Sequence, residues 1–197
     1  AVSHIQELYE EHKDAFSYTG WTEEKILTIL VYGALLHDVA KPDCRTVDEE
    51  GIHHFHGHPE AGAKKAKQIL RRLKFDNDTI SMVGRMILYH DRRYEQCYDK
   101  GAYCAKGKRG MRRLMNQIGE DAMPFLFLLQ KADLLAQSDY TREEKLAKLS
   151  AAVKAWKDVL ASNEAVKVSD LSIGGRDLIR NGIAPGPGLG EILHYLL

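Results

Sequence analysis

Hydrophobic residues recur at helical spacing along most of the chain, and one segment is apolar almost all the way round. From Ile26 to Ala40 most positions hold Ile, Leu, Val or Ala, which is typical of a helix buried on all sides. Thr22 is a good N-cap residue, and the glutamates after it suit the positive first turn of a helix. Because Pro42 cannot continue a helix, the pattern predicts a central buried helix between Thr22 and Pro42.

Two amphipathic segments follow a polar stretch over residues 43–57, which we predict to be a loop. The first begins near Pro59, a residue favoured in the first turn of a helix, and its apolar face lies opposite a basic one. The second begins at the cluster 76–78, and its apolar stripe carries His90 towards the core. Residues 92–110 show no clean period, and we predict a loop rich in Lys and Arg that is a candidate lid or substrate-facing segment.

The second half of the chain also carries helix signals. A short helix is predicted over residues 112–118, and Pro124 opens an apolar helix that reaches Asp133. Thr141 and Glu144 have the spacing of a capping box ahead of a long amphipathic helix. No segment alternates between apolar and polar residues as a strand does, so the predicted class is all-α, a helical bundle.

The C-terminal residues differ from the rest of the chain in their hydrophobic pattern. They form two short apolar-periodic pieces separated by the sequence Pro-Gly-Pro-Gly at residues 185–188. We therefore predict one main domain over residues 1–165 and a small C-terminal helical subdomain over residues 166–197.

Composition narrows the class of protein without naming its chemistry. The 28 basic residues balance 28 acidic ones, so overall charge indicates neither nucleic acid nor membrane as a partner. The three cysteines are odd in number and contain no C-x-x-C pair, which argues against a disulfide framework or a cysteine zinc site. With no apolar run of about eighteen residues and no signal peptide, the expected location is the cytoplasm.

Buried acids are the strongest chemical signal. His37 and Asp38 lie in the apolar central segment, where an unpaired carboxylate would cost several kcal/mol. Asp133 poses the same problem on the stripe of another apolar helix. A divalent ion shared by His37, Asp38 and Asp133 would satisfy both acids. Lys41, one turn beyond His37, would suit an anionic substrate such as a phosphate.

Simpler interpretations exist for each residue. A single His on an apolar face, such as His90, is more often a core residue than a metal ligand. Asp38 could cap a helix or pair with an arginine, and Asp133 could pair with Lys41. The four histidines at 53–58 could form a polar loop without a ligand, or a tract that binds metal adventitiously. We expect only one or two of them to belong to a site. The basic residues between positions 64 and 74 are best explained as a solvated helix face, and the alternative is a contact with nucleic acid.

Along the chain, candidate ligands occur in the order His4, His37-Asp38, His58, His90 and Asp133. This order on a helical frame resembles the HD superfamily of metal-dependent phosphohydrolases, which is named after a His-Asp pair like His37-Asp38. Longer segments resemble the HD and C-terminal region of bacterial CCA-adding tRNA nucleotidyltransferases. These segments cover residues 35–42, 54–63, 112–119, 132–137 and 170–193. Nothing in the sequence resembles the nucleotidyltransferase domain of those enzymes, so we do not expect this chain to add nucleotides by itself.

The resemblance implies a role for each matched residue. The implied ligands are His4, His37, Asp38 and Asp133 for one divalent ion, with Asp38 bridging to a second ion held by His58 and His90. The implied catalytic residues are Asp38 and Lys41, with Lys41 also contacting the substrate. Arg92 and Arg93, in the basic segment after His90, are predicted as further substrate contacts. Imidazole-rich sites favour Mn, Fe, Co, Ni or Zn over Mg. Two such ions can clamp phosphate oxygens and activate a water for attack on phosphorus.

We therefore expect a metal-dependent phosphohydrolase whose substrate is a nucleotide or another phosphorylated small molecule. The bond cleaved would be a phosphomonoester or a 2′,3′-cyclic phosphate of a nucleotide or RNA end. The alternative is a non-catalytic tRNA-binding region, which would recognise RNA backbone by shape and charge. A third interpretation, a purely structural helical domain, would leave Asp38 and Asp133 far apart or paired with cations.

Overall fold

The computed structural model describes residues 1–197 except 100–101, 104–106, 163–167, 169–170 and 197. Cα packing divides the chain into two units. The first unit comprises Ala1–Arg93 and Asp121–Leu149, and the second comprises Tyr94–Glu120 and Ser150–Leu197. Both units are helical, which confirms the all-α prediction. The predicted domain boundary between residues 165 and 166 lies outside the described residues.

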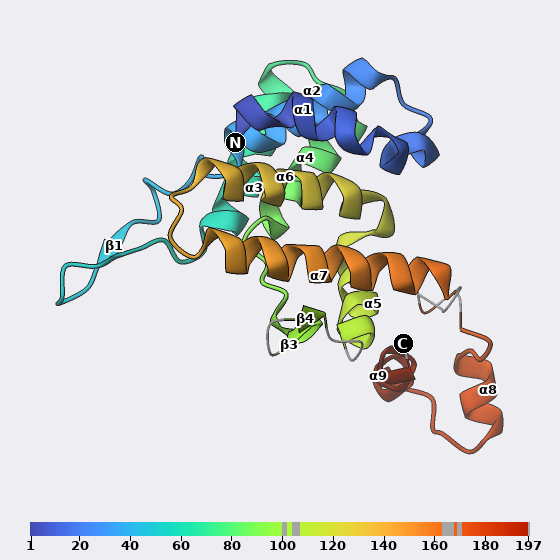
Figure 1. The fold of residues 1–197 in the computed structure, drawn as a ribbon. Helices are drawn as coiled ribbons and strands as arrows, with labels where there is room; N and C mark the ends of the chain where they lie inside the picture. Colours follow the sequence, from blue (N-terminus) through green and yellow to red (C-terminus); the bar gives the residue numbers. More distant parts are fainter. Residues whose placement is uncertain (100–101, 104–106, 163–167, 169–170, 197) are drawn as a thin grey trace. The chain divides into compact units, whose positions relative to one another are not determined.

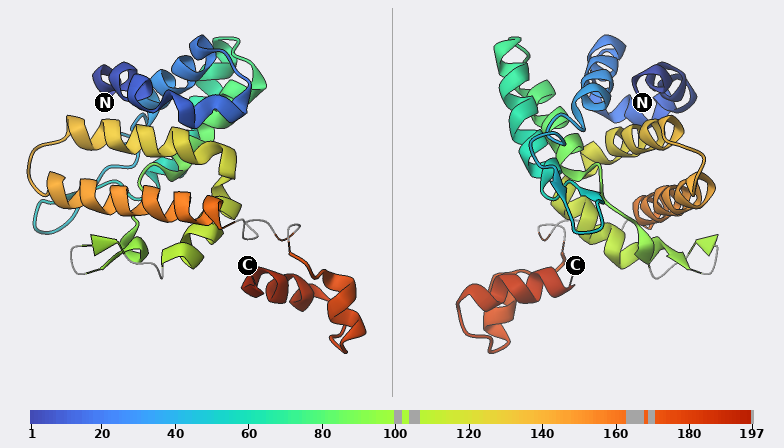
Figure 2. Two further views of the ribbon diagram at one scale, coloured as in Figure 1. Left: turned by 45° about the vertical axis from the view of Figure 1, so that its right-hand side comes forward. Right: turned by 90° about the vertical axis from the view of Figure 1, so that its left-hand side faces the viewer.

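The first unit is a bundle of α-helices that surrounds the apolar segment predicted to be central. Its helices are α1 (Val2–His12), α2 (Glu23–Leu36), α3 (His58–Arg72), α4 (Asn77–Tyr89) and α6 (Met123–Ala136), with 3₁₀ helices η1 (Lys13–Thr19) after α1 and η3 (Glu120–Ala122) before α6. Helix α2 packs against α1, α4 and α6, and α3 packs along α4 (Figures 1 and 2). Ile29 and Leu30 of α2 are fully buried as predicted, but Leu35 is 61% exposed, so the prediction of burial on all sides was wrong.

Local sequence explains where α3 and α4 begin. Gly57, with φ of 75°, precedes α3 in a left-handed conformation that suits glycine, and Pro59 lies in the first turn. Asp76 caps α4 by accepting hydrogen bonds from the backbone N–H groups of Asp78 and Thr79. Both starts agree with the prediction to within a residue or two, and both helices end or begin at a candidate ligand.

The central helix is shorter than predicted. Helix α2 ends at Leu36, and the chain continues to Cys44 in tight turns rather than as α-helix. Backbone bonds from Val39 N to Leu36 O, and from Lys41 N to Asp38 O, span three residues instead of four. The prediction that Pro42 ends the helix was therefore wrong. The tighter winding starts several residues earlier, so the pair at positions 37 and 38 lies at the end of α2.

Two short hairpins lie in segments predicted to be loops. Strand β1 (Thr46–Val47) pairs antiparallel with β2 (His53–His54) in the first unit, and β3 (Tyr98–Asp99) pairs with β4 (Ala102–Tyr103) in the second. Each strand has only two residues, too few to show alternation in the sequence. The hairpins leave the all-α class unchanged.

The second unit holds η2 (Glu95–Cys97), α5 (Gly107–Ile118), α8 (Gly175–Arg180) and α9 (Pro187–Leu196). Helix α5 begins five residues before the predicted start at 112, so its glycines were wrongly interpreted as loop residues. A Cβ on Gly107 would lie 2.7 Å from the Cα of Cys97, and one on Gly110 would lie 2.9 Å from Cγ of Gln96. These glycines let α5 approach η2 closely, and no loop is needed to explain them.

Helix α7 (Arg142–Ala161) runs from the first unit into the second. Its predicted capping box does not form. Thr141 has φ of 59°, which is unusual for a β-branched residue and differs from the extended conformation of an N-cap. The carboxylate of Glu144 forms an ion pair with the ammonium of Lys148 at 2.8 Å, and does not accept a hydrogen bond from the backbone N–H of Thr141.

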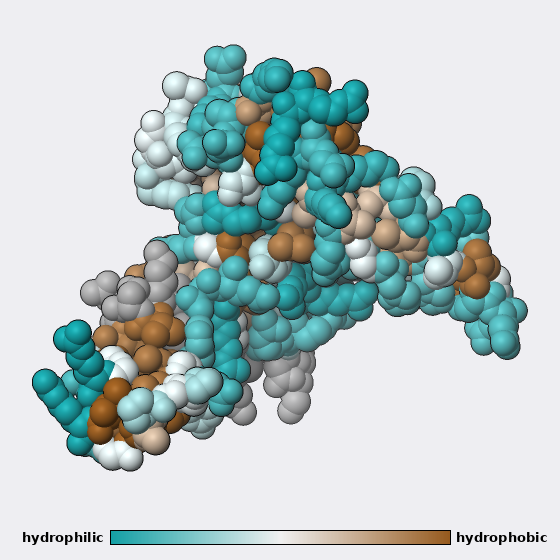
Figure 3. Space-filling model, turned by 180° about the vertical axis from the view of Figure 1, so that it is seen from behind, coloured by the Kyte–Doolittle hydropathy of each residue, from teal (hydrophilic) through white to brown (hydrophobic). Residues whose placement is uncertain are grey.

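The C-terminal segment exposes several apolar side chains. Figure 3 shows hydrophobic side chains gathered over α8 and α9. Exposed members of this segment are Ile173, Ile179, Tyr195 and Leu196. Two short helices on either side of the Pro-Gly sequence agree with the prediction for the tail. Among the described residues, no helix has the length and apolar character needed to cross a membrane.

Candidate metal centre

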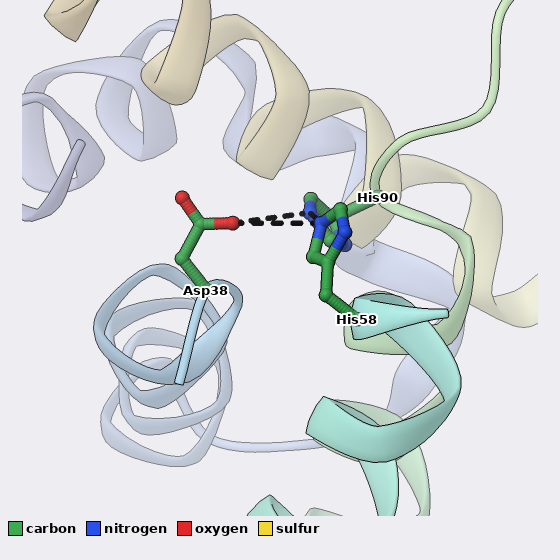
Figure 4. A group of neighbouring side chains, drawn as sticks. All are labelled: Asp38, His58 and His90. Atoms are coloured by element: carbon green, nitrogen blue, oxygen red, sulfur yellow. Dashed lines mark hydrogen bonds and ion pairs between the residues drawn. The ribbon is translucent and has the colours of Figure 1, made fainter. Parts of the chain in front are cut away.

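Asp38, His58 and His90 reach one point in the first unit from three different elements. Asp38 lies in the turns after α2, His58 is the first residue of α3, and His90 is the C-cap of α4. One nitrogen or oxygen of each lies within 4.8 Å of the others, and all three side chains point towards one another (Figure 4). The packing of α2 and α3 on α4 therefore assembles a set of donors with the spacing of metal ligands.

Three histidines in this region, at positions 37, 58 and 90, are oriented in the same way. In each, Nδ1 points to the backbone carbonyl three residues earlier, and Nε2 points towards the other candidate ligands. The acceptors are Ala34 O for His37 at 2.9 Å, Phe55 O for His58 at 2.8 Å and Ile87 O for His90 at 2.7 Å. A carbonyl can only accept, so Nδ1 carries the hydrogen, and in a neutral ring Nε2 presents its lone pair to the centre. Histidines that bind metals usually have such a partner on the second nitrogen.

The Nε2 atoms of His58 and His90 lie 3.3 Å apart, and they lie 3.7 and 3.5 Å from Oδ1 of Asp38. Two neutral imidazole lone pairs and a carboxylate oxygen repel one another at these distances unless a cation lies among them. Within the described residues, Oδ1 of Asp38 is also buried without a hydrogen-bond donor. This half of the centre fits a divalent ion with two nitrogen ligands and one oxygen ligand.

His37 forms the other half with Asp133, which lies on α6. Nε2 of His37 is 3.3 Å from Oδ1 of Asp133 and 3.2 Å from Oδ2 of Asp38. It is buried, and neither contact has the angles of a hydrogen bond. Burial lowers the pKa of His37, but contacts with Asp133 and Asp38 outweigh burial and raise this pKa to about 10. Without a metal, the proton on His37 supplies the positive charge that the two acids need.

Asp38 links the two halves because its oxygens face opposite ways. Oδ1 faces His58 and His90, and Oδ2 faces His37 and the ammonium of Lys41 at 2.7 Å. Burial raises the pKa of Asp38, but His37 and the ammonium of Lys41 hold that pKa well below its usual range. The pKa of Asp133 is also lowered, because His37 outweighs its burial. Both acids are therefore ionised at neutral pH and available to a cation.

His4, Arg92 and Arg93 stay predictions as site residues. His4 is half-buried on α1, and among the described residues its side chain makes no hydrogen bond or ion pair, so its role as a ligand stays a prediction. Arg92 and Arg93 are exposed just after α4. His54 pairs with Asp48 at 2.7 Å in the β1–β2 hairpin. Of the histidines at 53–58, the structure brings His58 alone to the centre, as the sequence interpretation had allowed.

Two glutamines that contact the centre were missed in the sequence. Gln137 donates to Oδ2 of Asp133, and Gln130 donates to the backbone carbonyl of His90. Gln130 interrupts a run of buried apolar residues in α6, and that interruption was a visible signal. Gln137 ends the helix and carries no comparable signal, since its contact depends on the tertiary structure.

Known proteins resemble this chain along most of its length. A sequence model of the HD domain family matches residues 2–151. The chain is 26% identical over 194 residues to an A-adding tRNA nucleotidyltransferase of Deinococcus radiodurans, covering 94% of this chain and 42% of that protein. It is 31% identical over 171 residues to a CC-adding tRNA nucleotidyltransferase of Thermus thermophilus, covering 83% of this chain and 34% of that protein. The chain therefore spans less than half the length of these relatives. No solved structure shows significant similarity.

Proposed function

The chain belongs to the HD domain family, and we propose that it is a metal-dependent phosphohydrolase that cleaves a phosphomonoester or a 2′,3′-cyclic phosphate of a nucleotide or RNA end. One observation supports this most strongly. Oδ1 of Asp38 is buried without a hydrogen bond to any described residue, and it faces the Nε2 lone pairs of His58 and His90 at 3.7 and 3.5 Å. Such groups are costly in a folded protein unless a cation completes the site.

The residues would hold two divalent ions. Asp38, His58 and His90 would hold one, and His37, Asp133 and Asp38 the other, with His4 as a further candidate on α1. Such ions polarise phosphate oxygens and lower the pKa of a bound water. The nitrogen-rich donor set favours Mn, Fe, Co, Ni or Zn over Mg.

The remaining polar residues suit an anionic substrate. Lys41 lies beside Asp38, so its ammonium can move to an oxygen of a bound phosphate and stabilise charge that develops there. Arg92 and Arg93 follow His90 directly in the chain, and guanidinium groups bind phosphates through paired hydrogen bonds. We propose that these three residues bind the substrate phosphate.

A metal analysis followed by an activity panel tests this function. Purified protein would be assayed with added Mn, Co, Ni or Mg against phosphomonoesters and 2′,3′-cyclic nucleotides. Asp38→Ala should lose metal and activity while keeping its fold. Asp48→Ala is a matched control, because Asp48 also contacts a histidine but lies in the hairpin. An Asp38→Ala protein that hydrolyses these substrates without metal would refute the proposal.

The second candidate is a non-catalytic tRNA-binding region. It is favoured by the relatives, since both are tRNA nucleotidyltransferases. In that case the protein would bind tRNA with an affinity that falls as salt rises, and hydrolysis would be absent with every metal. Asp38→Ala would then leave tRNA binding unchanged. Measuring both properties on the same preparation separates the two functions.

A further inference from the structure

Gln130 is a neutral amide in the most apolar part of α6, where it is 7% exposed. An amide buried without hydrogen bonds costs free energy, so its partners must compensate for its burial. Its Nε2 donates to the backbone carbonyls of His90 at 2.9 Å and Arg92 at 3.2 Å. His90 is the C-cap of α4, where carbonyls lack partners within the helix, and the Arg92 carbonyl lies just beyond it. Gln130 therefore fixes the backbone that carries the His90 ring.

Gln137 makes a different contact at the end of the same helix. Its Nε2 donates to Oδ2 of Asp133 at 2.7 Å, and its Oε1 accepts from Nζ of Lys145 at 3.2 Å. Because Lys145 can only donate, it fixes the amide with its NH₂ group towards the carboxylate. The bond occupies Oδ2 and leaves Oδ1 of Asp133 facing His37.

The two contacts fall on opposite halves of the centre. Gln130 acts on the half that contains His58 and His90, and Gln137 acts on the half that contains His37 and Asp133. We infer that Gln130 and Gln137 are positioning residues, each of which sets the affinity of one of the two metal ions. The inference rests on the proposed function, because it requires that divalent ions bind at the centre.

This assignment predicts how much metal affinity each variant should lose. Replacing a group that orients a metal ligand typically weakens metal binding by about 10- to 100-fold. We expect a loss in that range for one ion in each variant, with the other ion little affected. A residue that merely stabilised α6 would lower the melting temperature and would not discriminate between the ions.

The test is a set of double-mutant cycles with Mn²⁺ binding as the readout. Gln130→Met and Gln137→Leu would each be combined with His90→Ala and with Asp133→Ala, and Mn²⁺ affinities measured by titration calorimetry. We expect the effect of Gln137→Leu on Mn²⁺ affinity to be non-additive with that of Asp133→Ala and additive with that of His90→Ala. The effect of Gln130→Met should be non-additive with that of His90→Ala and additive with that of Asp133→Ala. Gln68→Leu, at an exposed position of α3, is the control and should change neither affinity.

The outcomes separate this inference from the proposed function. If the wild-type protein binds no Mn²⁺, the proposed function fails and the inference fails with it. If the wild-type protein binds Mn²⁺ and both glutamine variants bind it equally well, or couple equally to both ligand variants, the inference alone fails. Should Gln130→Met not fold, Gln130→Ala leaves room for water to satisfy the two carbonyls and serves in the same cycle.

Discussion

Lys41 should oppose metal binding and assist turnover, which are effects of opposite sign. Its ammonium lies 2.7 Å from Oδ2 of Asp38, an oxygen that we propose as a metal ligand. An incoming divalent ion must displace this positive charge and then remain close to it. Lys41→Met removes the charge with little change in size, so metal affinity should rise while the rate of hydrolysis falls.

The magnitude follows from the exposure of the pair. Two unit charges 4 Å apart interact by about 1 kcal/mol in bulk water and about 4 kcal/mol at an effective dielectric constant of 20. Because the Lys41 side chain is 40% exposed, the aqueous limit is appropriate. A divalent ion doubles this repulsion to about 2 kcal/mol, so we expect Mn²⁺ to bind roughly thirtyfold more tightly to Lys41→Met. Loss of a donor to the transition state should lower kcat by about 10²- to 10³-fold.

Titration calorimetry with Mn²⁺ and steady-state kinetics measure the two effects. Lys65→Met is a matched control, because Lys65 also pairs with an aspartate, Asp43, at 2.7 Å but outside the centre. It should change neither quantity, and Lys41→Arg should keep a metal affinity close to that of the wild type. Weaker Mn²⁺ binding in Lys41→Met, or an unchanged kcat, would refute this reasoning.

Three further predictions concern stability. Asp76→Ala removes the cap of α4 and should cost about 0.5–2 kcal/mol in urea unfolding. Hydrogen bonds from Thr79 and Lys25 lower the pKa of Asp76 in the folded protein. The contribution of Asp76 to the free energy of unfolding should therefore be complete above about pH 4 and be lost as the pH falls towards the folded pKa. Asp76→Asn should weaken this dependence of stability on acid pH. Leu126→Ala empties a fully buried site in α6 and should cost about 2–5 kcal/mol by the same assay. Mn²⁺ at about 100 times its Kd should raise the melting temperature of the wild type by roughly 5–10 °C, with reversal by a chelator and no effect on Asp38→Ala.

Helix positions could be predicted wherever periodicity and a cap agreed. Asp76 and Pro59 marked the starts of α4 and α3 because capping and proline geometry act locally. The start of α5 was missed because Gly107 serves close packing against η2, which is a tertiary effect. The early end of α2 was missed for a similar reason, since three-residue and four-residue turns have nearly the same sequence pattern.

Part of the candidate metal centre could be predicted from charged residues in apolar segments of the sequence. Asp38 and Asp133 stood out because acids in apolar segments need compensation. The structure leaves their side chains 35% and 28% exposed, less buried than predicted, and brings both to His37. For His58 and His90 the family resemblance was needed, since a histidine on an apolar stripe has a simpler explanation. Their neighbourhood depends on how α3 packs along α4, which periodicity alone does not specify.

A crystal structure of the protein soaked with Mn²⁺, with anomalous scattering recorded, tests the central claim most directly. We expect an anomalous peak at bonding distance from Oδ1 of Asp38 and from Nε2 of His58 and His90. A second peak should lie between His37 and Asp133, with Lys41 displaced from Asp38. Saturating Mn²⁺ that leaves this space without a peak and the bond from Lys41 to Asp38 intact would contradict the account.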